Sequence, residues 1–223
     1  MKKALLVCFL MLFVATVAFA GIAGSKHDFS AAGPYAGGTQ SSCAYCHAPH
    51  NALTTAPLWA RGNVTAAGSF TLYDSNSSMA GNNTLSGTTV NAPGNNSLTC
   101  LSCHDGVQDI GDVAVGTDNT GAIGNGTTVL AGLIASGNAL IGTSLANDHP
   151  VGIVYSSAAS LAGLTNAVVN GKVGGKNWMI YNGNDGVGRV ECGSCHNPHD
   201  NVTDPKFLKD SRATICSDCH ATK

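Results

Sequence analysis

One short pattern recurs four times in the 223-residue chain: two cysteines separated by two residues, with a histidine directly after the second. Cysteines three positions apart lie on one side of a helical turn, where both thiols can form thioethers to the vinyl groups of one haem. The histidine that follows lies beneath the haem, so its imidazole can bind the iron. The pattern therefore predicts four covalently bound haem c groups. The predicted attachment residues are Cys43, Cys46, Cys100, Cys103, Cys192, Cys195, Cys216 and Cys219, and the proximal iron ligands are His47, His104, His196 and His220.

These motifs contain every cysteine of the chain except Cys8. Eight cysteines could instead form four disulfides in an exported protein, or two four-cysteine zinc sites. Neither alternative explains a histidine after every pair, a coincidence with a random probability on the order of one in a million. The residues therefore favour haem.

Four histidines lie outside the motifs, one for each predicted haem. They are His27, His50, His149 and His199. This count predicts four bis-His, six-coordinate irons of low reduction potential. Met79, in a Ser/Asn-rich loop, and Met179, in an apolar run suited to packing, are the alternative axial ligands. Catalysis at haem needs an open iron position, so we expect the protein not to be an enzyme.

The spare histidines His50 and His199 occupy the same position in two similar strings, Cys-His-Ala-Pro-His and Cys-His-Asn-Pro-His. The intervening proline stiffens the turn, so each of these histidines is better placed to reach a second haem than the one attached beside it. If each spare histidine serves the next motif along the chain, a specific pairing follows. The pairs are then His27 with His47, His50 with His104, His149 with His196, and His199 with His220.

The ligands recur in the same order twice, which divides the chain into two two-haem halves, residues 21–112 and 113–223, as parts of one integrated domain. Residues 1–20 have the basic start, apolar run and Ala-Phe-Ala end of a secretory signal peptide. That run is shorter than the about 20 residues of a transmembrane helix. We therefore expect an exported protein with no membrane span.

The composition is poor for an ordinary hydrophobic core, since aromatic residues are 6% and charged residues 11% of the chain. We expect a mostly irregular fold with few short helices and strands, in which the haem stack replaces the core. The net charge of −2 gives no basic surface for nucleic acid. The expected elements are strands at 151–155, 177–181 and 187–190, helices within 157–169 and 206–219, and turn-rich loops at 62–97 and 111–147.

Several strings carry a family resemblance: the two Cys-His-x-Pro-His strings, Lys26–Ser30, Pro57–Trp59 and His149–Gly152. With them the chain resembles the doubled CxxCH multihaem c-type cytochromes, and within these the OmcE-type tetrahaem outer-surface filament ("nanowire") cytochromes of metal-reducing bacteria. The resemblance implies polymerisation with copies of itself into a continuous haem chain, with His50 binding a haem of the neighbouring subunit. Other multihaem cytochromes, and extracellular metal oxides or electrodes as terminal acceptors, are the further partners that it implies.

The function expected from these features is long-range extracellular electron transfer, by a protein that is secreted to the cell surface or beyond. The alternative is a monomeric periplasmic shuttle similar to tetrahaem cytochrome c₃. Such shuttles are smaller and have lysine-rich docking faces, whereas this chain has few charges to steer a partner.

Overall fold

Regular structure is sparse in this computed structural model. It describes residues 21–30, 41–49, 52, 58–61, 65, 69–72, 78–79, 83–84, 92–110, 133–155, 168–169, 172–173, 178–182 and 186–220. Within these residues there are three helices, α2 (Asn95–His104), α4 (Cys192–Cys195) and α5 (Ile215–Cys219). The prediction of a mostly irregular chain with few short helices and strands is confirmed. The expected signal peptide and His50 lie outside the described residues.

The strands are two or three residues long and form three small antiparallel sheets. One sheet pairs β1 (Ser78–Met79) with β2 (Asn83–Thr84). The second has the order β3-β8-β7, from Ile153–Val154, Gly188–Val190 and Tyr181–Asn182, and the third has the order β4-β5-β6, from Val168–Val169, Lys172–Val173 and Trp178–Met179. Such short ladders bury little surface, so the sheets pin loops together rather than form a layer of a core.

Most of the expected elements are present where the structure describes them. The strands expected at 151–155, 177–181 and 187–190 contain β3, β6 and β8, and the helix expected within 206–219 contains α5. The helix expected at 157–169 is wrong at its end, because Val168 and Val169 form β4, where two β-branched residues pair with β5. Met179 is not a packing residue: it is 44% exposed, while Trp178 beside it is buried.

Three small apolar clusters take the place of one continuous core in the described residues, and each lies against a different motif. The first contains Tyr45, from inside the first motif. The second packs Phe70 and Leu145 against α2, which carries the second motif. The third packs Trp178 against Cys219 of the last motif. The hydrophobic residues therefore support the motifs one by one.

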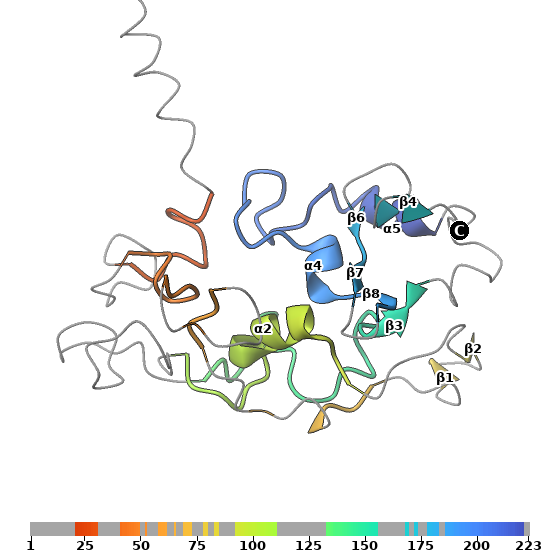
Figure 1. The fold of residues 1–223 in the computed structure, drawn as a ribbon, viewed down its shortest axis with the longest axis horizontal. Coiled ribbons are helices and arrows are strands. Elements are labelled where there is room, and N and C mark those ends of the chain that lie inside the picture. Colours follow the sequence, from red (N-terminus) through yellow and green to blue (C-terminus); the bar gives the residue numbers. More distant parts are fainter. Residues whose placement is uncertain are drawn as a thin grey trace, which may run out of the picture.

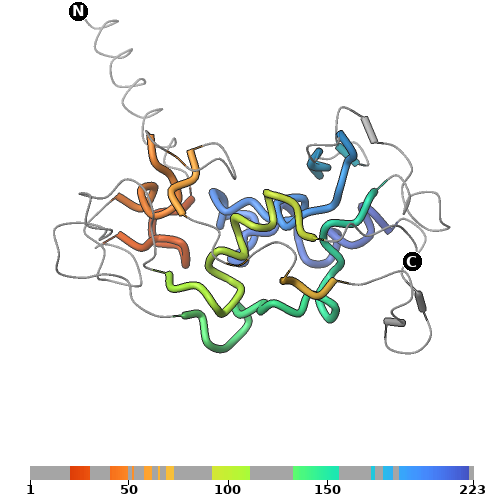
Figure 2. Tube along the Cα trace, turned by 60° about the horizontal axis from the view of Figure 1, so that its bottom comes forward, coloured from red at the N-terminus to blue at the C-terminus, as the bar shows by residue number. Residues whose placement is uncertain are grey.

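The motifs follow one another along the long axis of the molecule in the order of the sequence (Figure 1). The segment with the first motif, drawn in orange, lies at one end, α2 and α4 lie side by side in the middle, and α5 lies towards the other end. The same order is visible after rotation (Figure 2). The described part of the chain thus arranges its four motifs in a row.

The first and third motifs share a local architecture at a constant sequence offset. In the first, Ala48 N–H donates to the Leu58 carbonyl (2.8 Å) and Ala60 N–H to the Cys46 carbonyl (2.9 Å). In the third, Asn197 and Lys209 donate to the equivalent carbonyls (2.8 and 2.9 Å).

A strained residue stands at the same place in both copies, since Leu58 and Phe207 have φ of 59° and 62°. A positive φ costs a non-glycine residue about 1–3 kcal/mol and persists only where the surroundings impose it. Each of these motifs is therefore clamped by a segment that returns to it.

Candidate haem-binding sites

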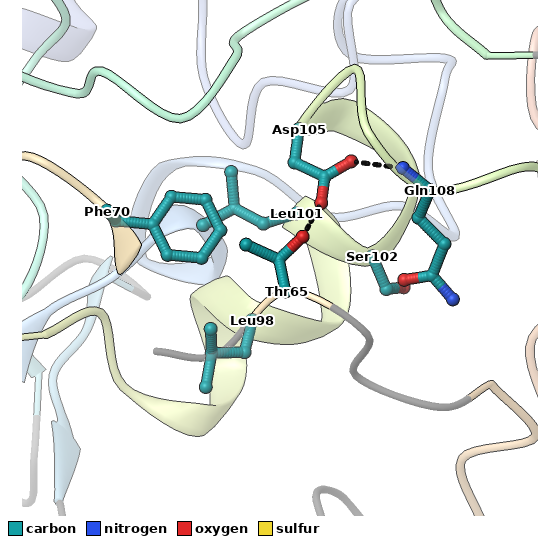
Figure 3. A pocket seen from close by; sticks show the side chains of 7 residues that line it. All are labelled: Thr65, Phe70, Leu98, Leu101, Ser102, Asp105 and Gln108. Atoms are coloured by element: carbon teal, nitrogen blue, oxygen red, sulfur yellow. Dashed lines mark hydrogen bonds between the residues drawn. The ribbon is translucent and has the colours of Figure 1, made fainter. Parts of the chain in front are cut away.

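One face of helix α2 packs against the rest of the protein, and the opposite face carries the second motif. Leu98, Leu101 and Ser102 are buried on one side of the helix (Figure 3). At 3.6 residues per turn, Cys100, Cys103 and His104 fall on the opposite side. The hydrophobic pattern of α2 thus fixes which way the second motif points.

A shallow hollow behind α2 leaves no enclosed room for even a water molecule. Ligand pockets are about 300–1,000 Å³, so this hollow is a packing gap and not a site for haem. Its lining residues are Thr65, Phe70, Leu98, Leu101, Ser102, Asp105 and Gln108 (Figure 3). Asp105 accepts hydrogen bonds there from Thr65 Oγ1 (2.5 Å) and from the Gln108 N–H (3.0 Å), which fixes the chain where α2 ends.

A buried polar network joins the second and third motifs. Glu191, 2% exposed, accepts hydrogen bonds from the Gly94 N–H (3.2 Å) and from the Ser97 hydroxyl. Burial raises the pKa of Glu191, and its bonds to Ser97 and Gly94 oppose that shift. The Cys192 N–H donates to Ser97 Oγ (3.1 Å) and the Gly193 N–H to Asn96 Oδ1 (2.7 Å). The start of α4 is therefore held by side chains of α2.

The cysteines of successive motifs lie near one another. Cys100 lies beside Cys192 where α2 contacts α4. Cys103 lies near Cys46, and Cys219 lies near Cys195. The motifs are thus connected in the order first, second, third and fourth.

None of the eight motif cysteines forms a disulfide. Burial raises the pKa of Cys46 to about 12 and that of Cys195 to about 11. These two cysteines are therefore protonated at neutral pH, unlike the low-pKa thiolates of redox and catalytic sites. In the described part of the chain no group of three or more His, Cys, Asp or Glu side chains is arranged to hold a metal ion without haem.

The structure brings spare histidines to motif histidines. The ring centroids of His27 and His104 are 6.1 Å apart, with an angle of 69° between the ring planes. Two further pairs have similar spacing: His47 with His199 (5.9 Å, 16°) and His149 with His220 (6.4 Å, 71°). These pairs differ from the pairing by chain order that the sequence suggested.

This spacing fits two imidazoles that bind one iron from opposite sides. A metal–imidazole bond is about 2.0–2.1 Å and the nitrogen is roughly 1.1 Å from its ring centre, so the two centres lie about 6 Å apart. Rotation about the metal–nitrogen bond leaves this separation unchanged, so both parallel and perpendicular rings are compatible with it. The residues present therefore fit bis-His haem iron.

Two proximal histidines are oriented as iron ligands usually are. The Nδ1 atoms of His104 and His196 lie 2.6 Å and 3.0 Å from the carbonyl oxygens of Ala139 and Lys206. A hydrogen bond from Nδ1–H to a backbone carbonyl fixes the tautomer and leaves Nε2 free for the metal.

His27 is held by its surroundings although it lies far from any motif in the sequence. Its ring stacks on Phe207 at 4.3 Å with an angle of 10°. Burial, followed by the nearby His104, lowers the pKa of His27 to about 4, and a hydrogen bond to the Pro198 carbonyl opposes that shift. The ring is therefore neutral at pH 7, the form that binds a metal.

Arg61 is a second buried charge near the motifs and is 1% exposed. Its guanidinium donates to the carbonyls of Ser102 (3.2 Å), Asp109 (2.8 Å) and Ile110. It also lowers the pKa of Cys46 and Cys103, against the larger effect of burial. Arg61 therefore ties the first motif's segment to the end of α2.

Sequence reasoning missed both Arg61 and the Glu191 network. The one available signal was charge: a chain with 11% charged residues places an arginine and a glutamate within apolar or small-residue segments. Their partners are 41 to 97 positions away, and such distances leave no local pattern.

Comparison with known proteins supports the haem interpretation for part of the chain. Residues 185–223, which contain the third and fourth motifs, match the family described as the doubled CXXCH motif, which is consistent with a multihaem c-type cytochrome. No curated protein matches the chain. None of the helices in the described residues has the length and apolar character needed to span a membrane.

Proposed function

We propose that this protein is a tetrahaem c-type cytochrome that conducts electrons over long distances outside the cell, and that it does so as a filament of identical subunits. Haem supplies the one-electron redox chemistry. The chain attaches the four haems, provides histidine ligands, and sets the order in which neighbouring haems meet. No bond of a substrate is made or broken in this reading, so the protein is an electron carrier and not an enzyme.

One observation carries the proposal: the motifs form a row in which each contributes a cysteine close to a cysteine of the next. Thioethers hold haem edges at their cysteines, so this arrangement brings successive haems close together. The elongated order of the motifs in Figure 1 agrees with it. A row of close haems suits electron conduction better than chemistry at one centre.

The ends of the row support the filament. Cys43 and Cys216, the first cysteines of the two outer motifs, are exposed, while the other six motif cysteines are less accessible. Both ends are thus open to a partner, and the interior is covered. A second copy, another multihaem cytochrome or a metal oxide could each receive an electron there.

The haem content is tested with protein matured in a host that attaches haem c. Mass spectrometry and the pyridine haemochrome spectrum should give four haems per chain, and Cys216→Ser/Cys219→Ser should lose one of them. The corresponding Cys→Ser double variants of the first and third motifs serve as matched controls. A haem-free mature protein, or one with fewer than four haems, would contradict the proposal.

The filament is tested separately by negative-stain microscopy of the secreted holoprotein. Filaments whose haems exchange electrons along their length would support the proposal. Protein that is monomeric at all concentrations, with four haems that reduce and reoxidise normally, would instead favour the periplasmic shuttle.

A further inference from the structure

The three histidine pairs point to an assignment of iron ligands that chain order does not give. We propose that His27 and His104 bind the iron of the second motif, His47 and His199 that of the first, and His149 and His220 that of the fourth. The assignment rests on the proposed haem attachment. It adds which spare histidine would be the second ligand of which iron.

The three pairs have the same composition. Each spare histidine that the structure describes faces a motif histidine, and each faces a different one. The three ring pairs all join a spare histidine to a motif histidine, although His27 also lies near His196 and His199, and His104 near His196. A set of incidental ring contacts would have no reason to follow this rule, whereas iron with one proximal and one distal ligand requires it.

The pair at the second motif is fixed from both sides. The His27 ring stacks on Phe207, and the His104 ring is bonded at Nδ1 to the Ala139 carbonyl. The 139–142 segment also donates two backbone hydrogen bonds to the His104 carbonyl, from Ile141 and Gly142 (2.9 and 3.0 Å). Both rings are therefore held at their 6.1 Å separation by contacts that do not involve each other.

The pair at the first motif connects distant parts of the chain. His47 is clamped by its bridge to Trp59, whose ring lies edge-on at 5.9 Å. His199 is set by a turn in which its N–H donates to Asn197 Oδ1 (3.2 Å). His199 follows the third motif in sequence, yet it faces the first motif at 5.9 Å. A histidine three residues after a proximal ligand thus serves another haem, as its proline-stiffened string suggested.

With the third pair assigned, one of the four proposed irons still lacks a second histidine. His149 and His220 are 6.4 Å apart at the fourth motif. Once these pairs are made, two of the eight histidines remain: His196 of the third motif, and His50. His50 lies outside the described residues, so the assignment covers three of the four proposed irons.

The assignment is tested by opening one iron at a time and asking which motif carries it. His199→Ala in reduced holoprotein should add one carbon monoxide-binding haem per chain, while the neighbouring Asp200→Asn should add none. When the first haem is deleted by Cys43→Ser/Cys46→Ser, His199→Ala should add no carbon monoxide site. When the fourth haem is deleted by Cys216→Ser/Cys219→Ser, it should still add one.

The reverse result, with the new site lost together with the fourth haem, would overturn the assignment in favour of pairing by chain order. A second measurement covers deletion variants that do not fold. In ferric His199→Ala with all four haems, the haem with altered paramagnetic NMR signals should show Overhauser contacts to the Cys43 and Cys46 protons. Contacts to any other motif would reject the pair. The haem count of the parent protein is measured first, so a failure of haem attachment is distinguishable from a wrong pairing.

Discussion

The junction of α2 with α4 and the segment around α5 carry the same chemical motif in very different settings. At the junction, Glu191 and Ser97 are buried and bonded to each other, and side chains of α2 hold the first residues of α4. Helix α5 has five residues and none is buried, and no side chain caps its start at Thr214. It touches the rest of the structure through the half-buried Ile215 and Cys219.

This difference indicates how much of each site the protein builds by itself. A hydrogen-bonded buried network resists local opening, whereas a short helix with few apolar contacts lies at the low end of local stability. The second and third motifs are therefore organised by the chain, whereas the order of the fourth would depend on the proposed haem.

The largest effect is expected when haem is withheld. In the haem-free chain, hydrogen exchange at 211–220 should become nearly as fast as in an unstructured peptide, because the packing of Ile215 and Cys219 is too little to order a five-residue helix by itself. The amides of Cys192 and Gly193, bonded to side chains of α2, should keep part of their protection. Hydrogen-exchange mass spectrometry of haem-free and holoprotein measures both segments. Equal loss in the two segments would show that the junction has no stability of its own.

A smaller effect is expected from removing the buried carboxylate. Glu191→Ala leaves the Ser97 hydroxyl and the Gly94 N–H without their acceptor, and each such buried donor costs about 1–3 kcal/mol. The free energy of unfolding of the holoprotein in guanidinium chloride should fall by roughly 2–6 kcal/mol.

The matched control lies in α5, where the exposed Ser217 hydroxyl donates to the Thr214 carbonyl. Ser217→Ala should change the free energy of unfolding by less than about 0.5 kcal/mol, as is usual at the surface. Similar losses for both variants would remove the distinction between the two regions.

The smallest expected effect is that the local stabilities of the two regions depend on pH with opposite signs. Burial holds the pKa of Glu191 above its usual 4.5, so the folded state binds more protons and the junction loses stability as pH rises through that raised pKa. The Arg212 side chain, followed by the Lys206 N–H, lowers the pKa of Asp204 below 3.8. That contribution is fully present above pH 3.8 and is lost as pH falls through the lowered pKa.

Hydrogen exchange, corrected for its intrinsic pH dependence, should therefore show opposite trends in residues 186–195 and 200–214. Glu191→Gln should abolish the first trend and leave the second. A common trend in both segments would contradict these local origins.

The sequence predicts the chemistry of this molecule better than its geometry. The spacing of Cys100, Cys103 and His104 specifies a site within one helical turn, so it is visible without a structure. The β-branched residues Val187 and Val190 likewise indicate the strand segment at 187–190. Val168 and Val169 show a signal that was overlooked, because Val169 pairs with Lys172 and the two residues between them in the sequence are Asn-Gly, which is typical of a tight β-hairpin.

The histidine partners could not be read from the order of the chain. His199 lies beside the third motif but faces His47, since the position of its ring depends on how the two motif strings pack together. Glu191 likewise precedes a motif cysteine in the sequence, but its structural role depends on the hydrogen bond that it accepts from Ser97 of another helix. Contacts at such separations are set by the whole fold.

The facing histidine pairs have a topological consequence for the unfolded chain. With iron between each pair, the haems would close three loops, at residues 27–104, 47–199 and 149–220, and each loop overlaps the next. In the chain-entropy treatment of cross-links, closing a loop of about 100 residues removes about 4.7 kcal/mol of denatured-state freedom. Interlocked loops also prevent either half from unravelling alone without releasing a ligand. A chain of small, flexible residues would thus gain rigidity through its connectivity, much as a small secreted protein gains it from crossed disulfides.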